Sequence, residues 1–298
     1  MTRTATWARV GTNISECENV QTALQTAGLD YTVTKSEILL PSGVVIPDKV
    51  ATIKEETGQY IGVVSKSYQI YQNQDAFEFV DSIPDIKFVK AGETNTGMVY
   101  IIGQLPETTV LNDTFAPYVI FQTSHNGRYN VKATICPLRI VCQNQFALSF
   151  RTMRNSFDIR HSRQLPSKVA QAQELIQDTA RYMAGFTNTA EELALLKISS
   201  RDTVYEIIDK FFDGTIELTE RQRKNMEEQK DQFMVCYTRE DNQNFQGTAW
   251  GMINAFSDYI THKKRKETKN SADSAFMSVT FDTEAMNKFM SLVMSDAR

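Results

Sequence analysis

The chain has 298 residues, enough for one large domain or two modest ones with a sizeable hydrophobic core. Hydrophobic residues make up 41% and charged residues 23% of the sequence, the proportions of an ordinary globular protein, and the net charge is -4. No apolar run approaches the roughly 20 residues that cross a bilayer, and the N-terminal sequence lacks the apolar block of a secretory signal. We therefore expect a cytoplasmic protein that spans no membrane.

The N-terminal half predicts short antiparallel strands with one intervening helix. Strand-like segments rich in Ile, Val, Thr and Tyr cover residues 32–40, 44–56, 58–73, 87–105, 116–124 and 128–142. The helix is predicted over residues 74–82, where Phe77 and Val80 are three residues apart. One hairpin is expected around Glu93–Gly97. A second is expected at His125-Asn126-Gly127, because Asn-Gly tolerates the positive φ of tight hairpin turns.

Beyond Asn144 the pattern predicts helices. Ser167 is a plausible N-cap for a helix with one stripe formed by Val169, Ala172, Leu175, Ile176, Thr179 and Met183. Further helices are predicted over residues 201–212, 220–237, 248–262 and 283–294. The polar stretch 263–274 is predicted to be a loop.

Strands followed by helices predict an α+β fold rather than an alternating β-α-β fold. We expect a mainly antiparallel β domain over residues 1–150, a basic connector over 151–166, and a helical domain over 167–298 that packs on the sheet.

Positive charge is concentrated between His125 and Lys168, a segment that we call the basic strip. It contains eight Lys or Arg residues and one acid, Asp158, so the remaining residues of the chain carry a net charge of -11. The strip spans the predicted junction between sheet and helices. A groove at this junction would attract a polyanion.

Aromatic residues are interleaved with these cations, a combination that binds single-stranded nucleic acid through phosphate contacts and base stacking. In the strand from Tyr129 to Arg139, Arg128 and Lys132 are expected on one face and Arg139 on the other, unless Pro137 interrupts the register. The alternative is structural: the aromatic residues belong to the core and the arginines cover a solvated face or pair with acidic helices. The candidate nucleic-acid-binding residues are Arg128, Tyr129, Lys132, Arg139, Arg151, Arg154, Phe157, Arg160, Arg163 and Lys168.

A second basic cluster follows the helix predicted to begin after Gly247. It comprises Lys263, Lys264, Arg265 and Lys266. Cations at a helix C-terminus are favoured by the helix dipole, which explains much of the cluster. A supplementary phosphate contact is the functional alternative.

The sequence offers no catalytic motif. Ser124 and His125 are adjacent without an acid partner in a triad pattern, and no glycine-rich phosphate loop is present. The four cysteines and three histidines show no metal-ligand spacing, so we expect no metal, no cofactor and no enzymatic activity. Trp250, Asn254, Asp258 and His262 recur every four residues, which suggests a hydrogen-bonded network between helices or subunits rather than a catalytic site.

Four segments in order resemble a known family: residues 27–38, 62–83, 121–145 and 247–262. They are similar to the phage- and plasmid-associated proteins grouped as domain of unknown function 932, and the resemblance extends from about Thr22 to Met294. It implies a mobile-element context without an assigned activity. The residues that match the family pattern are Gln72, Asn73, Phe77, Asp81, Ser124, His125, Gly127, Pro137, Arg139, Val141, Cys142, Asn144, Gly247, Trp250, Asn254, Tyr259 and His262.

A weaker, architectural likeness is to phage single-strand annealing proteins, which form rings or helical filaments. From it and the basic strip we expect a non-enzymatic, homo-oligomeric protein of a phage or plasmid that binds single-stranded DNA in recombination or replication in the host cytoplasm. Two alternatives remain open. One is an interaction protein that docks its basic strip on an acidic host protein; the other is a nuclease, for which the strip has too few carboxylates to hold magnesium.

Overall fold

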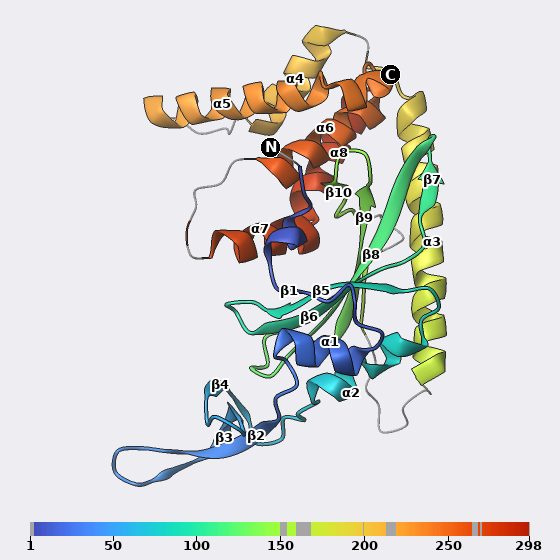
Figure 1. Cartoon of the computed structure of the whole chain (residues 1–298). Coiled ribbons are helices and arrows are strands. Elements are labelled where there is room, and N and C mark those ends of the chain that lie inside the picture. Colours follow the sequence, from blue (N-terminus) through green and yellow to red (C-terminus); the bar gives the residue numbers. More distant parts are fainter. Residues whose placement is uncertain are drawn as a thin grey trace.

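Two antiparallel sheets and a set of helices make up the computed structural model of the chain (Figure 1), which describes residues 3–149, 154–158, 168–198, 200–212, 219–263, 268 and 270–297. Strands dominate the N-terminal half and helices the C-terminal half, so the predicted α+β class is confirmed.

The main sheet is antiparallel, with strand order β1-β5-β6-β8-β9-β10 and two short additional strands at its margins. Its strands are β1 (Thr12–Asn13), β5 (Lys87–Glu93), β6 (Met98–Gln104), β8 (Asp113–Ser124), β9 (Lys132–Arg139) and β10 (Asn144–Gln145), with β7 (Thr108–Val110) paired to β8 and β11 (Ser156–Asp158) paired to β9. Both predicted hairpins are present, as β5–β6 and β8–β9.

A separate small sheet contains β2 (Val33–Leu39), β3 (Val45–Lys54) and β4 (Tyr60–Ser65). Period-two patterning predicts these strands and their antiparallel pairing, but it does not show that they form their own sheet. In Figure 1 the β2–β3 hairpin projects away from the rest of the molecule.

The described helices comprise α-helices (α) and short 3-10 helices (η). In chain order the helices are η1 (Thr6–Arg9), α1 (Val20–Ala27), α2 (Asn73–Phe77), η2 (Glu78–Ser82), α3 (Lys168–Leu195), α4 (Arg201–Phe212), α5 (Glu220–Tyr237), η3 (Glu240–Phe245), α6 (Ala249–His262), α7 (Ser271–Phe281) and α8 (Glu284–Asp296). The predicted bounds of α4 and α5 are confirmed. Thr248 caps α6 by accepting a hydrogen bond from the Gly251 amide at 3.1 Å.

Both faces of the main sheet are covered, because alternate residues of its strands enter two different cores. On β6, Val99 and Ile101 join the core that contains α3, α4 and α6, whereas Tyr100 and Ile102 join a smaller core with Trp7 and Phe276. In the predicted stripe of α3, Ala172, Leu175, Thr179 and Met183 are buried and Ile176 is half-buried, whereas the side chain of Val169 lies outside the described residues. Helices therefore pack directly on the sheet.

Helix α7 contradicts the predicted loop over residues 263–274, because the helix already begins at Ser271. Its first turn is polar, but the helix also contains the buried Phe276, whose ring centroid lies 5.0 Å from that of Tyr100. Burial against the second face of the sheet stabilises this helix, and its local sequence signal is limited to the short helical spacing of Ala272, Ala275, Phe276 and Val279.

Candidate nucleic-acid interface

The connection between β8 and β9, residues 125–131, forms the centre of the candidate site, and we call it the 125–131 loop. Ser124 closes its base: its hydroxyl accepts from the Tyr129 amide and donates to the Tyr129 carbonyl, both at 3.0 Å. The first strand pair of the hairpin is Gln122 with Lys132, so the connection is longer than the predicted tight turn. Gly127 takes the expected positive φ of 73°, but Asn126 does not have a positive φ.

Asn126 instead acts through its side chain. Its amide donates to the Thr96 carbonyl at 2.9 Å, and its Oδ1 accepts from the Arg128 amide at 3.1 Å. The same side chain lies against the backbone of Gly62 on β4. One residue thus joins the small sheet, the β5–β6 turn and the 125–131 loop.

A second set of bonds fixes the small sheet to this loop. The buried Thr52 hydroxyl donates to the His125 carbonyl at 2.8 Å, and the Tyr68 hydroxyl donates to the Ser124 carbonyl at 2.9 Å. These bonds connect β3 and the segment after β4 to the end of β8. The junction of the two sheets is therefore preorganised.

A pocket of about 510 Å³ opens at this junction, between the small sheet, the β5–β6 turn and the 125–131 loop. Its lining includes Lys54, Tyr60, Glu93 and Arg128. Lys54 is already held: its ammonium lies 3.4 Å from the Glu93 carboxylate and 3.8 Å from the centroid of the Tyr31 ring. Arg128 is exposed, and within the described ranges no carboxylate lies in ion-pair distance of its guanidinium.

Tyr60 is the exposed aromatic residue of this pocket. It is 62% exposed at the start of β4, and it shares the pocket with Arg128. A flat aromatic face and an accessible guanidinium on one polar pocket suit an unstacked base and its phosphate.

A smaller pocket of about 290 Å³ lies on the other side of the 125–131 loop. Three tyrosines contribute to its wall, Tyr68, Tyr71 and Tyr129, together with Asp158. Tyr129, a predicted stacking residue, is half-buried and its hydroxyl lies 2.9 Å from the Thr96 hydroxyl. Its ring packs against the smaller core, so only part of it is available for contact.

His125, the first residue of the loop, has a buried side chain whose hydrogen bond has a structural role. Its Nε2 lies 2.8 Å from Oδ1 of Asn73, and the Asn73 amide donates to the Leu29 carbonyl at 2.8 Å. Burial, with a smaller effect of Lys54, lowers the pKa of His125 to about 4. Ser124 bonds the backbone of Tyr129, so Ser124 and His125 form no nucleophile-base pair.

Strand β11 brings the described part of the connector next to β9. Phe157 pairs in register with Ala133, and Asp158 with Lys132. The Asp158 carboxylate lies 3.6 Å from the Lys132 ammonium, so the single acid of the basic strip partly neutralises this cation. Phe157 is half-buried against the main core, and Arg154 is exposed beside it. The sequence-predicted meeting of hairpin and connector is therefore present for these residues.

Arg139 is not available to a ligand, which corrects its assignment to the binding surface. Its side chain is 3% exposed and lies 2.6 Å from the Asp113 carboxylate. The guanidinium also donates to the Asp241 carbonyl at 2.7 Å, which links β9 to η3. The strand alternation that places Arg139 opposite Lys132 is consistent with this burial; Arg139 connects sheet and helices inside the protein.

The remaining candidates lie wholly or partly outside the described residues. Arg151, Arg160, Arg163, Lys264, Arg265 and Lys266 are outside them, and for Lys168 only the backbone position at the start of α3 is described. Lys263 caps the C-terminus of α6, with its ammonium 5.5 Å from the centroid of the Tyr259 ring.

The expected network along the four-residue repeat on α6 is only partly present. Asp258 and His262 bond other elements, whereas Trp250 Nε1 and Asn254 Oδ1 are buried without a hydrogen-bond partner among the described residues. Asp258 accepts from Arg3 at 2.8 Å and lies 3.4 Å from Arg239. Burial raises the pKa of Asp258, whereas the two arginines oppose that shift. His262 Nε2 lies 3.1 Å from both the Cys142 carbonyl and Oδ1 of Asn144. The network ties the N-terminus and β10 to α6.

Sequence reasoning missed Tyr60, Tyr68 and Lys54 as site residues. Their segments are rich in tyrosine and lysine, but they precede the basic strip by about sixty residues of chain. Only the docking of the small sheet on the 125–131 loop brings them together.

Within the part of the chain that the structure describes, no cluster of three or more His, Cys, Asp or Glu residues has a geometry that would hold a metal. The helices of that part include none long and apolar enough to span a bilayer.

The fold and site thus define an α+β protein with a polar, aromatic and basic pocket where its two sheets meet. The chain belongs to the family described as domain of unknown function DUF932, which matches residues 60–291. No curated protein and no solved structure is significantly similar to it. The match begins at Tyr60, so the N-terminal segment 27–38 lies outside it, whereas the other three segments that resemble the family lie inside.

Proposed function

We propose that this protein binds single-stranded nucleic acid without catalysing a reaction, as a homo-oligomer that serves recombination or replication of a phage or plasmid. The observation that supports the proposal best is the pairing of Tyr60 and Arg128 on one pocket of about 510 Å³. Tyrosine stacks a base of any sequence, and a guanidinium contacts the adjoining phosphate.

Single strands fit this pocket better than a duplex. A base can stack on Tyr60 only when its face is free, whereas the bases of a duplex already stack on one another. Other residues of the 125–131 loop line the second pocket, together with Asp158, the ion-pair partner of Lys132. A strand that leaves Tyr60 would therefore follow this loop towards Lys132.

The test is fluorescence anisotropy with labelled single-stranded and double-stranded oligonucleotides at several salt concentrations. Tyr60→Ala removes a stacking face and is expected to weaken binding by about 5- to 160-fold, the effect of about 1–3 kcal/mol per stacked base, whereas Tyr60→Phe retains affinity. Arg128→Ala removes one phosphate contact, so the slope of log affinity against log salt becomes shallower by about 0.7.

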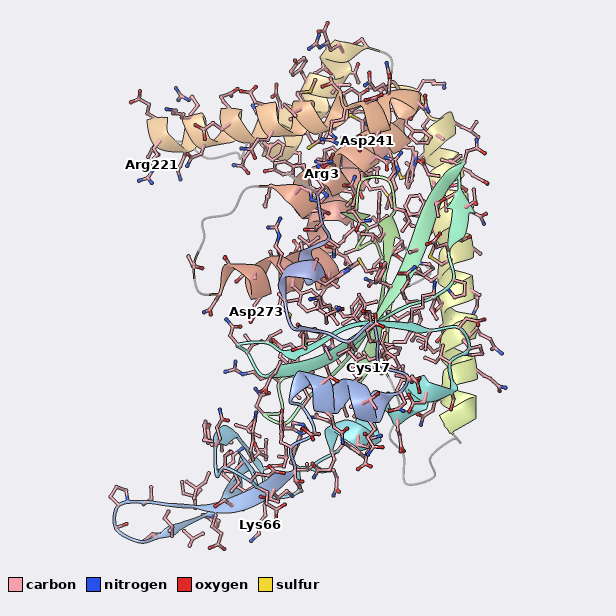
Figure 2. The ribbon with its side chains drawn as sticks, in the orientation of Figure 1. Arg3, Cys17, Lys66, Arg221, Asp241 and Asp273 are labelled. Carbon is pink, nitrogen blue, oxygen red and sulfur yellow. The ribbon has the colours of Figure 1, made fainter. Side chains whose placement is uncertain are left out.

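Arg221→Ala is the matched control, because Arg221 is an exposed arginine on α5, far from the small sheet (Figure 2). It is expected to change neither affinity nor slope. Absence of oligonucleotide binding at low salt, or equal effects of Arg128→Ala and Arg221→Ala, would contradict the proposal. Recovery of a stoichiometric acidic protein from nuclease-treated lysate, together with absent oligonucleotide binding, would favour a protein-docking function instead.

A further inference from the structure

An acidic side chain, Glu93 at the end of β5, lines the pocket that contains Tyr60 and Arg128. It is the one acid among the described residues of the lining. A carboxylate repels phosphate, so Glu93 adds nothing to the phosphate contact proposed for Arg128. Its side chain is 27% exposed and therefore within reach of a ligand. An acceptor in this place suits another part of a nucleotide, the edge of the base.

Two donors hold the Glu93 carboxylate through the same oxygen. The Tyr31 hydroxyl donates to Oε2 at 3.2 Å, and the Lys54 ammonium donates to Oε2 at 3.4 Å. Burial, with a further effect of Glu93, raises the pKa of Tyr31, so this hydroxyl keeps its proton and remains a donor. Among the described residues no hydrogen bond or ion pair engages Oε1. The carboxylate is thus fixed by one oxygen and offers the other to a ligand.

Lys54 brings the strand that carries Tyr60 next to this carboxylate. The Lys54 amide donates to the Gln59 carbonyl at 2.9 Å, and Tyr60 is the next residue along the chain. The ammonium of the same lysine reaches Glu93. Both the aromatic ring and the acceptor therefore belong to one pocket of about 510 Å³. A base that lies on the Tyr60 ring can present its edge to Oε1 of Glu93.

The uncharged polar side chains of the pocket do not select one kind of base edge. Asn126 already bonds backbone groups with both polar atoms of its side chain. The hydroxyls of Thr94 and Thr96 lie 2.9 Å apart and bond each other. An exposed amide such as Gln59 can turn to either accept or donate. A carboxylate only accepts, so Glu93 is the group of this lining that distinguishes a donor from an acceptor on the base.

The bases differ in what they offer to such an acceptor. Cytosine, adenine and guanine carry an exocyclic amino group that donates hydrogen bonds, whereas thymine and uracil carry only carbonyl oxygens outside the ring. The ring N–H of thymine and uracil lies between two of these oxygens, which a carboxylate repels. Cytosine and uracil are nearly equal in size, so comparing them separates recognition of the base edge from stacking.

We infer that Glu93 selects the base that stacks on Tyr60, by accepting a hydrogen bond at Oε1 from the exocyclic amino group of cytosine, adenine or guanine. Thymine and uracil are disfavoured. Glu93 is in this way a specificity-determining residue of the pocket. The inference rests on the proposed function and adds a preference among bases to it: stacking on Tyr60 gives affinity for any base, and Glu93 sets the ratio between them.

The test is fluorescence anisotropy of the full chain with single-stranded oligodeoxycytidylate and oligodeoxyuridylate of equal length, at neutral pH and one salt concentration. The wild type is expected to bind the cytosine strand about 10-fold more tightly, the effect of one hydrogen bond to a charged acceptor. Glu93→Gln keeps the size of the side chain, but its amide can donate to uracil as well as accept from cytosine. In this variant the ratio of the two affinities should fall to about 2-fold or less.

Glu55→Gln is the matched control, because it removes the same charge from an exposed position just after β3, outside the lining of the pocket. Loss of either negative charge is expected to strengthen the binding of both strands, so the ratio of affinities is the readout rather than the affinity itself. Glu55→Gln should retain the wild-type ratio. Circular dichroism and thermal melts check that each variant folds.

Equal affinity of the wild type for the two strands, or a preference for uracil, overturns the inference without any variant. An unchanged ratio in folded Glu93→Gln also overturns it, as does an equal loss of the ratio in Glu93→Gln and Glu55→Gln. Failure of this inference is separable from failure of the proposed function. Binding that depends on Tyr60 and Arg128 but shows no preference among bases would leave the proposed function intact, whereas absence of binding to either strand would remove both.

Discussion

The side chain of Asn126 occupies the space that a Cβ atom on Gly62 would need. Such an atom would lie 2.6 Å from Asn126 Cβ and 2.8 Å from its Cα. Glycine is therefore required on β4 for the small sheet to dock on the 125–131 loop. The pocket that contains Tyr60 and Arg128 exists only while this contact is made.

Gly62→Ala is expected to separate the two sheets locally, because the neighbouring atoms are backbone and Cβ atoms that cannot move independently. Overpacking of this kind costs about 1–3 kcal/mol, to be measured by urea unfolding. Oligonucleotide affinity should fall together with stability. Ser65→Ala, an exposed change on the same strand and outside the pocket lining, should leave both unchanged; a fully stable and active Gly62→Ala would contradict the assigned contact.

Substitutions of two arginines of the basic strip are expected to have different effects on the free energy of unfolding. Arg139→Ala leaves the Asp113 carboxylate and the Asp241 carbonyl without their buried cation, a loss of about 3 kcal/mol or more in unfolding free energy. Arg128→Ala removes an exposed side chain and should change stability by less than about 0.5 kcal/mol. Chemical denaturation checks both values. If Arg139→Ala weakened oligonucleotide binding at unchanged stability, Arg139 would be a ligand contact after all.

The fold class and most helices could be predicted from the sequence because the signals are local. The bounds of α4 and α5 follow from their apolar spacing, and the capping residue Thr248 marks α6. Helix α7 could not be predicted, since its polar first turn resembles a loop and its stability comes from Phe276 packing against Tyr100.

The candidate site was only partly predictable for the same reason. Arg128, Tyr129 and Lys132 follow from local charge and aromatic content, but charge alone does not distinguish Arg128 from the buried Arg139. Strand alternation places these two residues on opposite faces. It therefore predicts which arginine is exposed better than charge does. Tyr60 requires knowledge of how the small sheet docks, which depends on Gly62 and Asn126, distant residues with no shared local pattern.

The connector arginines give a further prediction. Arg151, Arg154, Arg160 and Arg163 follow β9 in the chain, and β11 holds Phe157 and Asp158 next to its edge. If the strand path continues from Arg128 past Lys132, changing all four arginines to Ala should make the salt slope shallower by up to about 3. Combining these changes with Arg128→Ala should lower affinity further. An unchanged slope would confine the site to the pocket with Tyr60.

The buried histidines predict a loss of stability in mild acid. His125 is 1% exposed. When its Nε2–H donates to Asn73 Oδ1, an added proton binds Nδ1. Nδ1 has no hydrogen-bond partner among the described residues, so the protonated ring would leave a buried N–H group unpaired. The pKa of His125 is lowered to about 4 by burial and by Lys54, and that of His262 to about 4 by burial and by Arg3.

Because each folded-state pKa lies below the unfolded value of about 6.5, the unfolded chain binds the extra proton first as pH falls. Stability is therefore complete above about pH 6.5 and declines towards pH 4, with a loss of about 2 kcal/mol from His125 alone by pH 5. Urea unfolding of wild type and His125→Gln at neutral pH and at pH 5 measures this term, since the carboxylates titrate alike in both proteins. The variant should be less stable at neutral pH but lose less stability on acidification; an equal pH dependence would mean that His125 titrates normally in the folded protein.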